Sequence, residues 1–494
     1  MILETLIIIV YGLALLLIFL YALVQINLLY NCIKAKKIPD TSEKFNFSNP
    51  DEIPFVTIQL PVYNEMYVME RLLNNMSKID YPKDKLEIQV LDDSTDESLQ
   101  TTAKHVKQLQ QTGLNIQHIT RINRKGFKAG ALKEGLKTAK GEFIAIFDAD
   151  FLPKKDWLRQ TIPYFKNEKL GVVQTRWSHI NRDYSLLTKV QAFALDAHFT
   201  LEQVGRNIQG HFMNFNGTAG VWRKSCILDA GNWKDDTLTE DLDLSYRAQL
   251  KNWEFKYLEH VETPAELPVV MSAARSQQFR WNKGAAENFR KSFLKVIRSK
   301  DVSFKTKVHA FFHLLNSTMF LNMFVLVVLS VPMLFIKQYE VYNLYMLGLG
   351  FFIISSVLFF IFYWQMYKTI YGKGLKNFIS YIGMFFTFFT IIMGFSLHNG
   401  IASLEGHLGK RSDFIRTPKF NINTIADSWK GNKYLKNTMS FNTIFEGVLA
   451  LYFGFGLYSA FTITQHGDFG FFALHLMAFI GFGYVFLKSL RFEN

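Results

Sequence analysis

Long apolar runs lie at both ends of the chain, and a more polar stretch of globular character separates them. The first run covers residues 6–29, which is long enough to cross a hydrocarbon layer about 30 Å thick. Five more apolar runs follow the globular stretch, at residues 311–336, 344–364, 378–397, 441–464 and 471–487. The pattern predicts an integral membrane protein whose globular domain, residues 34–281, is inserted between membrane segments.

The first apolar run predicts an uncleaved anchor over residues 1–33. It has no basic leading segment and no small-residue cleavage site, which a signal peptide would show. Lys34, Lys36 and Lys37 follow it directly, and lysine and arginine accumulate on the cytoplasmic side of membrane segments. We therefore expect the N-terminus outside and the globular domain in the cytoplasm.

Charge balance predicts that one of the later apolar runs does not cross the membrane. If all five crossed, a basic stretch would lie outside, against the charge rule. That stretch contains Lys410, Arg411, Arg416, Lys419, Lys430, Lys433 and Lys436. We expect two transmembrane helices in residues 309–366, an interfacial or re-entrant segment with a basic loop in residues 367–440, and two helices with a short cytoplasmic tail in residues 441–494. Six crossings in all are the alternative to these five.

Residues 282–308 combine lysine and arginine with phenylalanine, leucine and valine. This composition is typical of an amphipathic helix that lies in the headgroup plane. An ordinary helix that caps the domain is the alternative.

Short β-branched runs alternate with helical patterns in the domain, which predicts an α/β fold with a largely parallel sheet. The predicted strands cover residues 56–60, 86–91, 116–120 and 143–147, and the predicted helices cover residues 65–79, 96–111 and 129–139. Ligands of such sheets bind beyond the carboxyl ends of the strands. Asp92-Asp93 and Asp148-Ala149-Asp150 each follow a predicted strand directly, so we expect the two acidic clusters to share one site.

Two carboxylates at one strand end would repel a diphosphate ligand unless a divalent cation bridged them. Mg²⁺ and Mn²⁺ prefer hard oxygen ligands, from one or two carboxylates together with substrate phosphates. Asp148 and Asp150 would supply the carboxylates, and Lys128 offers a positive charge to the phosphates. A lone Asp-x-Asp is more often an ordinary turn, and the strand placement is what favours a site.

Thr237-Leu238-Thr239-Glu240 has the form of a capping box, with a helix predicted to continue to Leu250. Asp241 would then lie in the first helical turn, where the helix dipole favours its ionised form. As a general base it would need burial or a nearby phosphate to raise its pKa again. A carboxylate that merely supports the helix start is the alternative.

Gln277-Gln278-Phe279-Arg280-Trp281 stands just before the amphipathic stretch. The forked guanidinium of Arg280 suits a diphosphate, and Trp281 offers a flat face to a sugar ring. Alternatively, Trp281 anchors an amphipathic helix at the membrane surface.

Net charge and cysteine spacing limit the classes of protein to which this sequence can belong. The net charge of +13 agrees with basic cytoplasmic loops, and no basic stretch interleaved with aromatic residues indicates a nucleic-acid groove. The two cysteines, Cys32 and Cys226, have no metal or redox spacing, which excludes a disulfide scaffold.

Together these motifs resemble the family 2 glycosyltransferases, in particular the cellulose synthases and cellulose-synthase-like proteins. The ordered set is Leu60-Pro61-Val62-Tyr63-Asn64-Glu65, Asp92-Asp93-Ser94, Lys128-Ala129-Gly130, Asp148-Ala149-Asp150, Thr239-Glu240-Asp241 and Gln277-x-x-Arg280-Trp281. Residues 215–223 resemble the glucomannan and mannan synthase branch, the cellulose-synthase-like A and C proteins. Phe414-x-x-Thr417-x-Lys419 is similar to the gating loop of bacterial cellulose synthase, so the resemblance covers residues 54–419.

The resemblance implies a GT-A fold and an inverting transfer from a nucleotide-sugar, UDP-glucose or GDP-mannose, to a sugar hydroxyl. It makes Asp241 the general base, and Asp148 and Asp150 the ligands of Mg²⁺ or Mn²⁺. The implied nucleotide-sugar site consists of Tyr63, Glu65, Asp93, Lys128, Asp148 and Asp150. The implied acceptor and diphosphate side consists of Phe215, Asn216, Gly217, Thr218, Glu240, Gln277, Arg280 and Trp281. The implied gating residues are Phe414, Thr417 and Lys419.

Two departures from the cellulose synthase pattern stand out. Arg416 occupies the position of a valine in the gating motif. The sequence also ends soon after the last apolar run, so we expect no cyclic-dinucleotide-binding domain, which argues mildly against cellulose as the product.

We therefore expect a processive synthase of a β-1,4-mannan or glucan that exports its product. One alternative is a single transfer to a lipid acceptor such as ceramide or polyprenyl phosphate, and another is a transport or scaffold protein that has lost catalysis. A bacterial inner membrane is favoured over a Golgi membrane because the chain has no long plant-type insertions.

Overall fold

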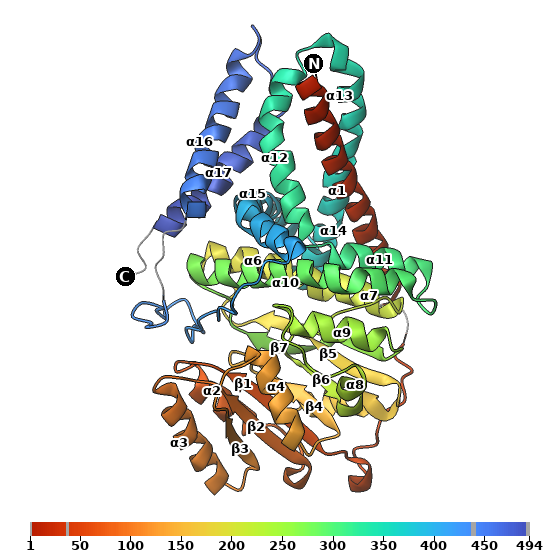
Figure 1. The fold of residues 1–494 in the computed structure, drawn as a ribbon, viewed down its shortest axis with the longest axis vertical. Coiled ribbons are helices and arrows are strands. Elements are labelled where there is room, and N and C mark those ends of the chain that lie inside the picture. The colour runs from red at the N-terminus through yellow and green to blue at the C-terminus, as the bar shows by residue number, and fades with distance from the viewer. Residues whose placement is uncertain (1, 36–38, 436–440, 491–494) are drawn as a thin grey trace.

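The computed structural model describes residues 2–35, 39–435 and 441–490. An α/β domain lies at one end of the long axis and a bundle of long apolar helices at the other (Figure 1). Helices α6 (Leu186–Ala197), α10 (Met271–Arg298) and α11 (Phe304–Leu314) lie between the two parts. This layer joins the domain to the bundle.

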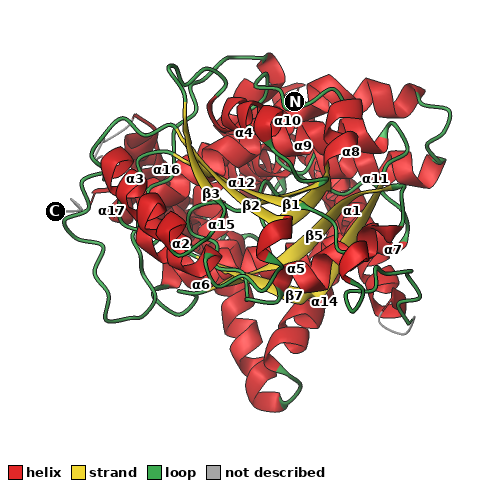
Figure 2. Cartoon of the chain, turned by 90° about the horizontal axis from the view of Figure 1, so that it is seen from below, coloured by secondary structure: helices red, strands yellow, loops and turns green. Residues whose placement is uncertain are grey.

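The domain is built on a seven-stranded sheet with the order β3-β2-β1-β4-β6-β5-β7. Its strands are β1 (Val56–Val62), β2 (Leu86–Asp92), β3 (Ile116–Thr120), β4 (Phe143–Ile146), β5 (Leu170–His179), β6 (Gly220–Arg223) and β7 (Glu254–Ala265). β6 is antiparallel to both of its neighbours, and the other pairs are parallel. The predicted α/β fold is confirmed, and the reversed β6 makes the sheet mixed. Helices cover the sheet, as seen from below in Figure 2.

The helices of the domain outnumber the four that the sequence pattern predicts. They are α2 (Met69–Met76), α3 (Ser98–Gln111), α4 (Phe127–Thr138), α5 (Trp157–Thr161), α7 (Gln203–Ile208), α8 (Lys224–Asp229) and α9 (Glu240–Gln249). The predicted helix over residues 65–79 is too long at both ends. Asn64 adopts a left-handed backbone conformation with φ of 53°, and the turn that follows it carries Glu65 away from α2.

The amphipathic stretch predicted at residues 282–308 is two helices in the structure. α10 begins at Met271, where Val270 is still extended, and α11 begins after the cap of Ser303. The motif from Gln277 to Trp281 therefore lies inside α10 and not before it. α10 directs this motif toward the domain. The predicted helix start after residue 281 did not indicate this orientation.

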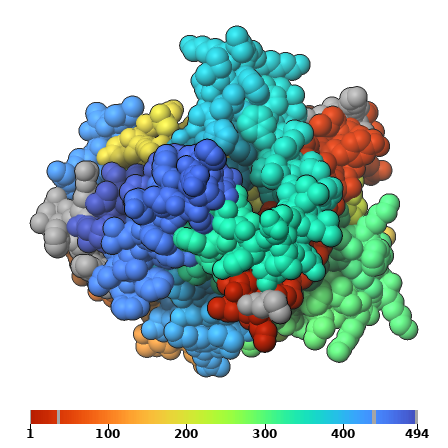
Figure 3. All heavy atoms as spheres, turned by 90° about the horizontal axis from the view of Figure 1, so that it is seen from above, coloured from red at the N-terminus to blue at the C-terminus, as the bar shows by residue number. Residues whose placement is uncertain are grey.

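Among the described residues, six helical segments are long and apolar enough to cross a membrane. They are Ile2–Lys34, Thr318–Ile336, Glu340–Tyr371, Leu375–Leu408, Phe441–Thr462 and Phe472–Leu490. They correspond to α1 (Ile2–Ala35), α12 (Thr318–Ile336), α13 (Asn343–Gly350) with α14 (Ile354–Tyr371), α15 (Leu375–Leu408), α16 (Phe441–Thr462) and α17 (Phe472–Leu490). From above, α1 (red) and the last helices (blue) lie on the same end of the molecule (Figure 3).

Both ends of α15 lie near the α/β domain or the layer of helices that joins it to the bundle. Just before its start, the hydroxyl of Tyr371 accepts a hydrogen bond from Arg182 of the domain, at 2.9 Å. Near its other end, Glu405 accepts one from Lys283 of α10, also at 2.9 Å. These contacts favour a segment that does not cross, and the number of crossings stays a prediction.

Cysteine labelling can count the crossings, because both natural cysteines are buried. With five crossings, Lys430→Cys should react with a membrane-impermeant maleimide only after permeabilisation, and His466→Cys should react in sealed cells. Tyr339→Cys, between α12 and α13, is the external control in either topology. Labelling of Lys430→Cys in sealed cells, with protection of His466→Cys, would establish six crossings.

Candidate active site

One pocket lies beyond the carboxyl ends of β1, β2 and β4 and is closed on its other sides by α9, α10 and the segment after α15. Most of the predicted site residues line it, namely Tyr63, Glu65, Asp93, Lys128, Asp148, Asp150, Asn216, Gly217, Glu240, Asp241, Gln277, Arg280, Trp281, Phe414, Thr417 and Lys419. Residues from eight separate stretches of the chain therefore meet at one place, at the strand ends where such sheets bind ligands.

Two residues of the predicted set do not line the pocket. Phe215 is fully buried and packs edge-on against Trp222 in the core of the domain. The hydroxyl of Thr218 accepts a hydrogen bond from the backbone N–H of Asp148, at 2.9 Å, and so fixes the strand end behind the pocket. The structure does not place either side chain on the acceptor side, because Phe215 packs into the core and Thr218 binds the backbone at the end of β4.

The acidic pair after β4 is matched by two lysines. Lys128 donates to Asp148 at 2.5 Å and to the carbonyl of Gly217 at 3.0 Å. Lys419 donates to Asp150 at 2.7 Å. Burial lowers the pKa of Lys128, but the carboxylate of Asp148 and its neighbours outweigh that effect and raise it overall. Both lysines are therefore charged at neutral pH, and a diphosphate would find two cations beside two carboxylates.

The pair Asp148 and Asp150 also fits a divalent cation. The Oδ1 atom of Asp150 is buried and has no hydrogen-bond partner among the described residues, so it is free to ligate. No group of three or more His, Cys, Asp or Glu side chains that could hold a metal occurs in the described part of the chain. The remaining ligands of Mg²⁺ or Mn²⁺ would have to be phosphate oxygens and water, which is the usual arrangement for these ions.

The part of the pocket near β1 and β2 is flat and charged. The guanidinium of Arg124 lies 3.3 Å from the centre of the Tyr63 ring. Asp93 is held by Arg121, whose Nε donates to it at 2.8 Å. Glu65 is paired with Arg416 at 2.9 Å, and burial raises the pKa of Glu65 to about 7 although Arg416 opposes the rise. A planar ring of a ligand that lay beside Tyr63 would have the carboxylates of Asp93 and Glu65 at its edges.

The first turn of α9 carries Asp241 into the pocket, as predicted. A Cβ atom added to Gly217 would lie 2.9 Å from Oδ2 of Asp241, so only glycine leaves room there. Burial raises the pKa of Asp241 to about 7, and the adjacent carboxylate of Glu240 adds to the rise. The pKa of Glu240 is itself raised, chiefly by burial. Burial thus overcomes the helix dipole, and Asp241 has the pKa of a general base.

The predicted capping box is absent. Thr239, not Thr237, is the residue that precedes α9, and it makes no side-chain cap. The amide of Asn288 on α10 donates instead to the carbonyl oxygen and the hydroxyl of Thr239, at 3.1 and 2.9 Å. α10 thus positions the start of α9, and Glu240 is left to face the pocket.

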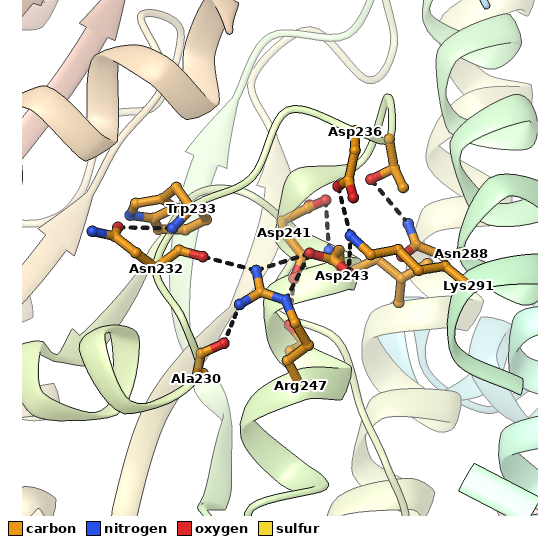
Figure 4. Close-up of polar contacts among 12 residues, drawn as sticks. Ala230, Asn232, Trp233, Asp236, Asp241, Asp243, Arg247, Asn288 and Lys291 are labelled. Atoms are coloured by element: carbon orange, nitrogen blue, oxygen red, sulfur yellow. Dashed lines mark hydrogen bonds and ion pairs between the residues drawn. The ribbon is translucent and has the colours of Figure 1, made fainter. Parts of the chain in front are cut away.

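Asp243 on the same helix has a different role from Asp241. It is fully buried between Arg247, at 2.8 Å, and Lys291, at 2.7 Å, and Lys291 also holds Asp236 (Figure 4). This network fixes α9 on its far side. Oδ1 of Asp241 accepts a hydrogen bond from the backbone N–H of Leu242, at 2.8 Å, and its other oxygen is directed to the pocket.

The motif of α10 meets the basic loop after α15. Arg280 donates to the hydroxyl of Thr417 at 2.8 Å, and its guanidinium lies 4.6 Å from the centre of the Phe414 ring. Phe414 also stacks on Phe127 at the start of α4. The loop therefore lies in the pocket, with Thr417 and Lys419 both engaged.

Several pocket residues were missed from the sequence, among them Arg124, Trp177 and His179. Trp177 and His179 end β5, and Arg124 follows β3. The rule that placed the acidic clusters at strand ends would have found Trp177 and His179, had β5 been recognised as a strand, and Arg124 lies in the loop after the predicted strand at residues 116–120. The rings of Trp177 and Trp281 are 6.5 Å apart and form an aromatic corner of the pocket.

The fold and site define a GT-A-type domain, with acidic residues at strand ends and a candidate base in the same pocket. The family model described as "Glycosyltransferase like family 2" matches residues 54–284. This part of the chain is therefore similar to the glycosyltransferases of family 2.

Known proteins resemble the same part of the chain. Glucomannan 4-beta-mannosyltransferase 1 of Oryza sativa subsp. japonica is 43% identical over 281 residues, which are 56% of this chain and 53% of that protein. Glucomannan 4-beta-mannosyltransferase 2 of Arabidopsis thaliana is 42% identical over 287 residues, 56% of this chain and 54% of that protein. The chain spans about half the length of the curated relatives it matches.

A solved structure, "Mannosyltransferase PcManGT from Pyrobaculum calidifontis in complex with GDP-Man and Mn2+", has 20% sequence identity to this chain. Its TM-score is 0.49, over 74% of this chain and 100% of that chain.

The raised pKa of Asp241 predicts an acidic limb in the pH profile. A protonated carboxyl cannot accept a proton, so kcat/KM for transfer should fall tenfold per pH unit below about pH 7. Glu65 titrates in the same range, and Glu65→Gln is therefore the control. The variant should keep the limb even where its rate is lower. Loss of the limb in Glu65→Gln would assign the titration to Glu65.

Proposed function

We propose that the protein is a membrane-embedded inverting glycosyltransferase that adds sugar from a nucleotide-sugar to a growing β-1,4-mannan or glucan. The observation that carries this proposal is the position of Asp241. A carboxylate with a pKa near neutrality shares one pocket with the acidic pair after β4 and with Arg280. A base and a diphosphate site on opposite sides of one cavity are what a single displacement at a sugar carbon needs.

The reaction is a direct displacement at the anomeric carbon of the donor sugar. Asp241 takes the proton of the acceptor hydroxyl, the hydroxyl oxygen bonds to the anomeric carbon, and the bond from that carbon to the diphosphate oxygen breaks. Arg280 and Lys128 stabilise the charge of the departing nucleoside diphosphate. One displacement inverts the configuration, so an α-linked donor gives a β-linked product.

The nucleotide would lie at the β1–β2 end of the pocket. The ring of Tyr63 offers a face to the base, and Asp93 and Glu65 offer carboxylates to ribose or base donors. Lys419 would reach the diphosphate from the loop after α15. The structure is equally suited to UDP-glucose and GDP-mannose by these contacts, and the names of the plant relatives favour mannose.

Asp148 and Asp150 would hold Mg²⁺ or Mn²⁺, through the free oxygen of Asp150 and the partly exposed carboxylate of Asp148. When bound, the cation would neutralise the negative charge of the diphosphate.

A glycan acceptor is favoured over a lipid acceptor by the aromatic corner of the pocket. Trp177 and Trp281 present ring faces of the kind against which sugar rings pack, beside Asp241. The loop of Phe414, Thr417 and Lys419 closes the donor side, as a gating loop would. Five crossings with the domain in the cytoplasm would place the acceptor beneath the membrane bundle, through which a polymer could leave. Bacterial inner membrane remains our preferred location over Golgi membrane.

Replacement of the proposed base tests this assignment. Asp241→Asn should abolish transfer of radiolabelled sugar, by about 10³-fold or more, because the amide that replaces the carboxylate cannot take the proton. Binding of the nucleoside diphosphate should persist, since Asp241 is not among the residues that would hold it. Asp236→Asn, on the exposed loop before α9, is the matched control and should retain transfer. Retained turnover in Asp241→Asn would remove Asp241 from this role.

Removal of divalent cations tests the metal. Treatment with EDTA should abolish transfer, and Mg²⁺ or Mn²⁺ should restore it. Asp150→Asn should raise the cation concentration for half-maximal transfer about tenfold, because a charged ligand is lost. Full activity in EDTA would show that the two lysines suffice for the diphosphate.

A further inference from the structure

A chain of hydrogen bonds lies behind the acceptor side of the pocket, between α6 and α7. The amide nitrogen of Gln203 donates to the carbonyl of Asn214 at 2.9 Å and to the side-chain oxygen of Asn216 at 2.8 Å. The side-chain nitrogen of Asn216 lies 3.1 Å from Nε2 of His198. Asn216 lines the pocket, and Gln203 is fully buried behind it.

The chain continues on the far side of the histidine. Nδ1 of His198 lies 3.1 Å from Oε2 of Glu202, which also accepts from Arg206 at 3.2 Å. Burial raises the pKa of Glu202, but Arg206 and His198 outweigh that effect and lower it to about 2. Glu202 is therefore an ionised carboxylate that can only accept hydrogen bonds.

Each end of this chain of hydrogen bonds is a group that can only accept a hydrogen bond, namely the carbonyl of Asn214 and the carboxylate of Glu202. These two groups determine which atoms between them donate. The carbonyl of Asn214 requires the amide nitrogen of Gln203, which then faces the oxygen of Asn216. The nitrogen of Asn216 must therefore face His198 and donate to its Nε2. At the other end, the carboxylate of Glu202 requires a proton on Nδ1 of His198. Both ends therefore require the same neutral tautomer of His198, with its proton on Nδ1, and the same orientation of the Asn216 amide.

A local break in helix geometry makes this arrangement possible. Residues His198–Glu202 form a π-helical turn, in which the N–H of Gln203 bonds to the carbonyl of His198. In a regular α-helix, residues five apart point about 140° away from each other. The wider π turn brings His198 and Gln203 to the same side, where both reach Asn216. Such single π turns occur often at functional sites.

Asn216 stands where the acceptor must bind if Asp241 is the base. The next residue, Gly217, lies against Oδ2 of Asp241, so the reacting hydroxyl and its sugar ring come beside residues 216 and 217. After its bonds to Gln203 and His198, the amide of Asn216 keeps one N–H and one lone pair. These can bind one sugar hydroxyl as donor and acceptor.

We propose that His198 and Gln203 are positioning residues that hold the side-chain amide of Asn216 in one orientation for recognition of the acceptor sugar. The inference rests on the proposed function, because it requires a sugar hydroxyl at Asp241. His198 and Gln203 do not touch the substrate and act through Asn216.

Two substitutions of His198 separate positioning from packing. In His198→Gln, the side-chain oxygen takes the place of Nε2 and can still accept from Asn216. In His198→Asn, the shorter amide can reach Glu202 but not Asn216. With a β-1,4-linked mannotetraose as acceptor, His198→Asn should raise the acceptor KM about tenfold, and His198→Gln should change it less than about threefold. The donor KM and the hydrolysis of donor by water should be unchanged in both.

The double variant His198→Asn with Asn216→Ala should be no worse than Asn216→Ala alone, because both changes act through one contact. If His198→Asn does not fold, Gln203→Met keeps the side-chain shape, removes the same orientation, and should raise the acceptor KM equally. An unchanged acceptor KM, additive effects, or a matching rise in donor KM would each overturn the proposal. Absence of both transfer and donor hydrolysis in the unaltered protein would instead refute the proposed function.

Discussion

The pairing of buried carboxylates with cations is the constraint on which the rest of the structure depends. Charges removed from water are costly unless they are paired. Around the pocket Lys128 faces Asp148, Lys419 faces Asp150, and Arg416 faces Glu65. Two of these three cations come from the loop after α15, so the domain does not complete its own site. The membrane part and the domain are thereby tied together through charge, and the donor pocket is built only when that loop is in place.

Among the described residues, Asp241 and the adjacent Glu240 form no ion pair, and burial gives Asp241 a pKa near neutrality. Removal of these carboxylates from water costs free energy, and the same removal raises the pKa of Asp241 into the range of a general base. α10 links these features, because Asn288 positions the start of α9, Arg280 holds Thr417, and Lys283 holds Glu405. A single helix between domain and bundle thus contacts the residue before α9, the basic loop and the helix that leads to that loop.

Much of the catalytic domain could be predicted from the sequence, because strand periodicity and strand ends are local features. β1 to β4 and the placement of Asp93, Asp148 and Asp150 follow from them. The orientation of Phe215 and Thr218 could not be predicted, since it depends on tertiary contacts with Trp222 and with the backbone of Asp148. The capping box failed because Asn288, distant in sequence, supplies the contacts of Thr239. The ion pair of Arg416 with Glu65 and the π turn at His198 are likewise tertiary features that no local sequence pattern indicates.

Repeated addition of sugar to a glycan distinguishes a polysaccharide synthase from an enzyme that makes a single transfer. The size of the product tells the two apart. Purified protein in lipid nanodiscs would receive Mg²⁺ or Mn²⁺ with radiolabelled GDP-mannose or UDP-glucose, and the products would be separated by solvent extraction and size. The account predicts label in a polysaccharide that a β-1,4-mannanase or a β-1,4-glucanase degrades. Label confined to a lipid-extractable conjugate of one sugar would contradict it.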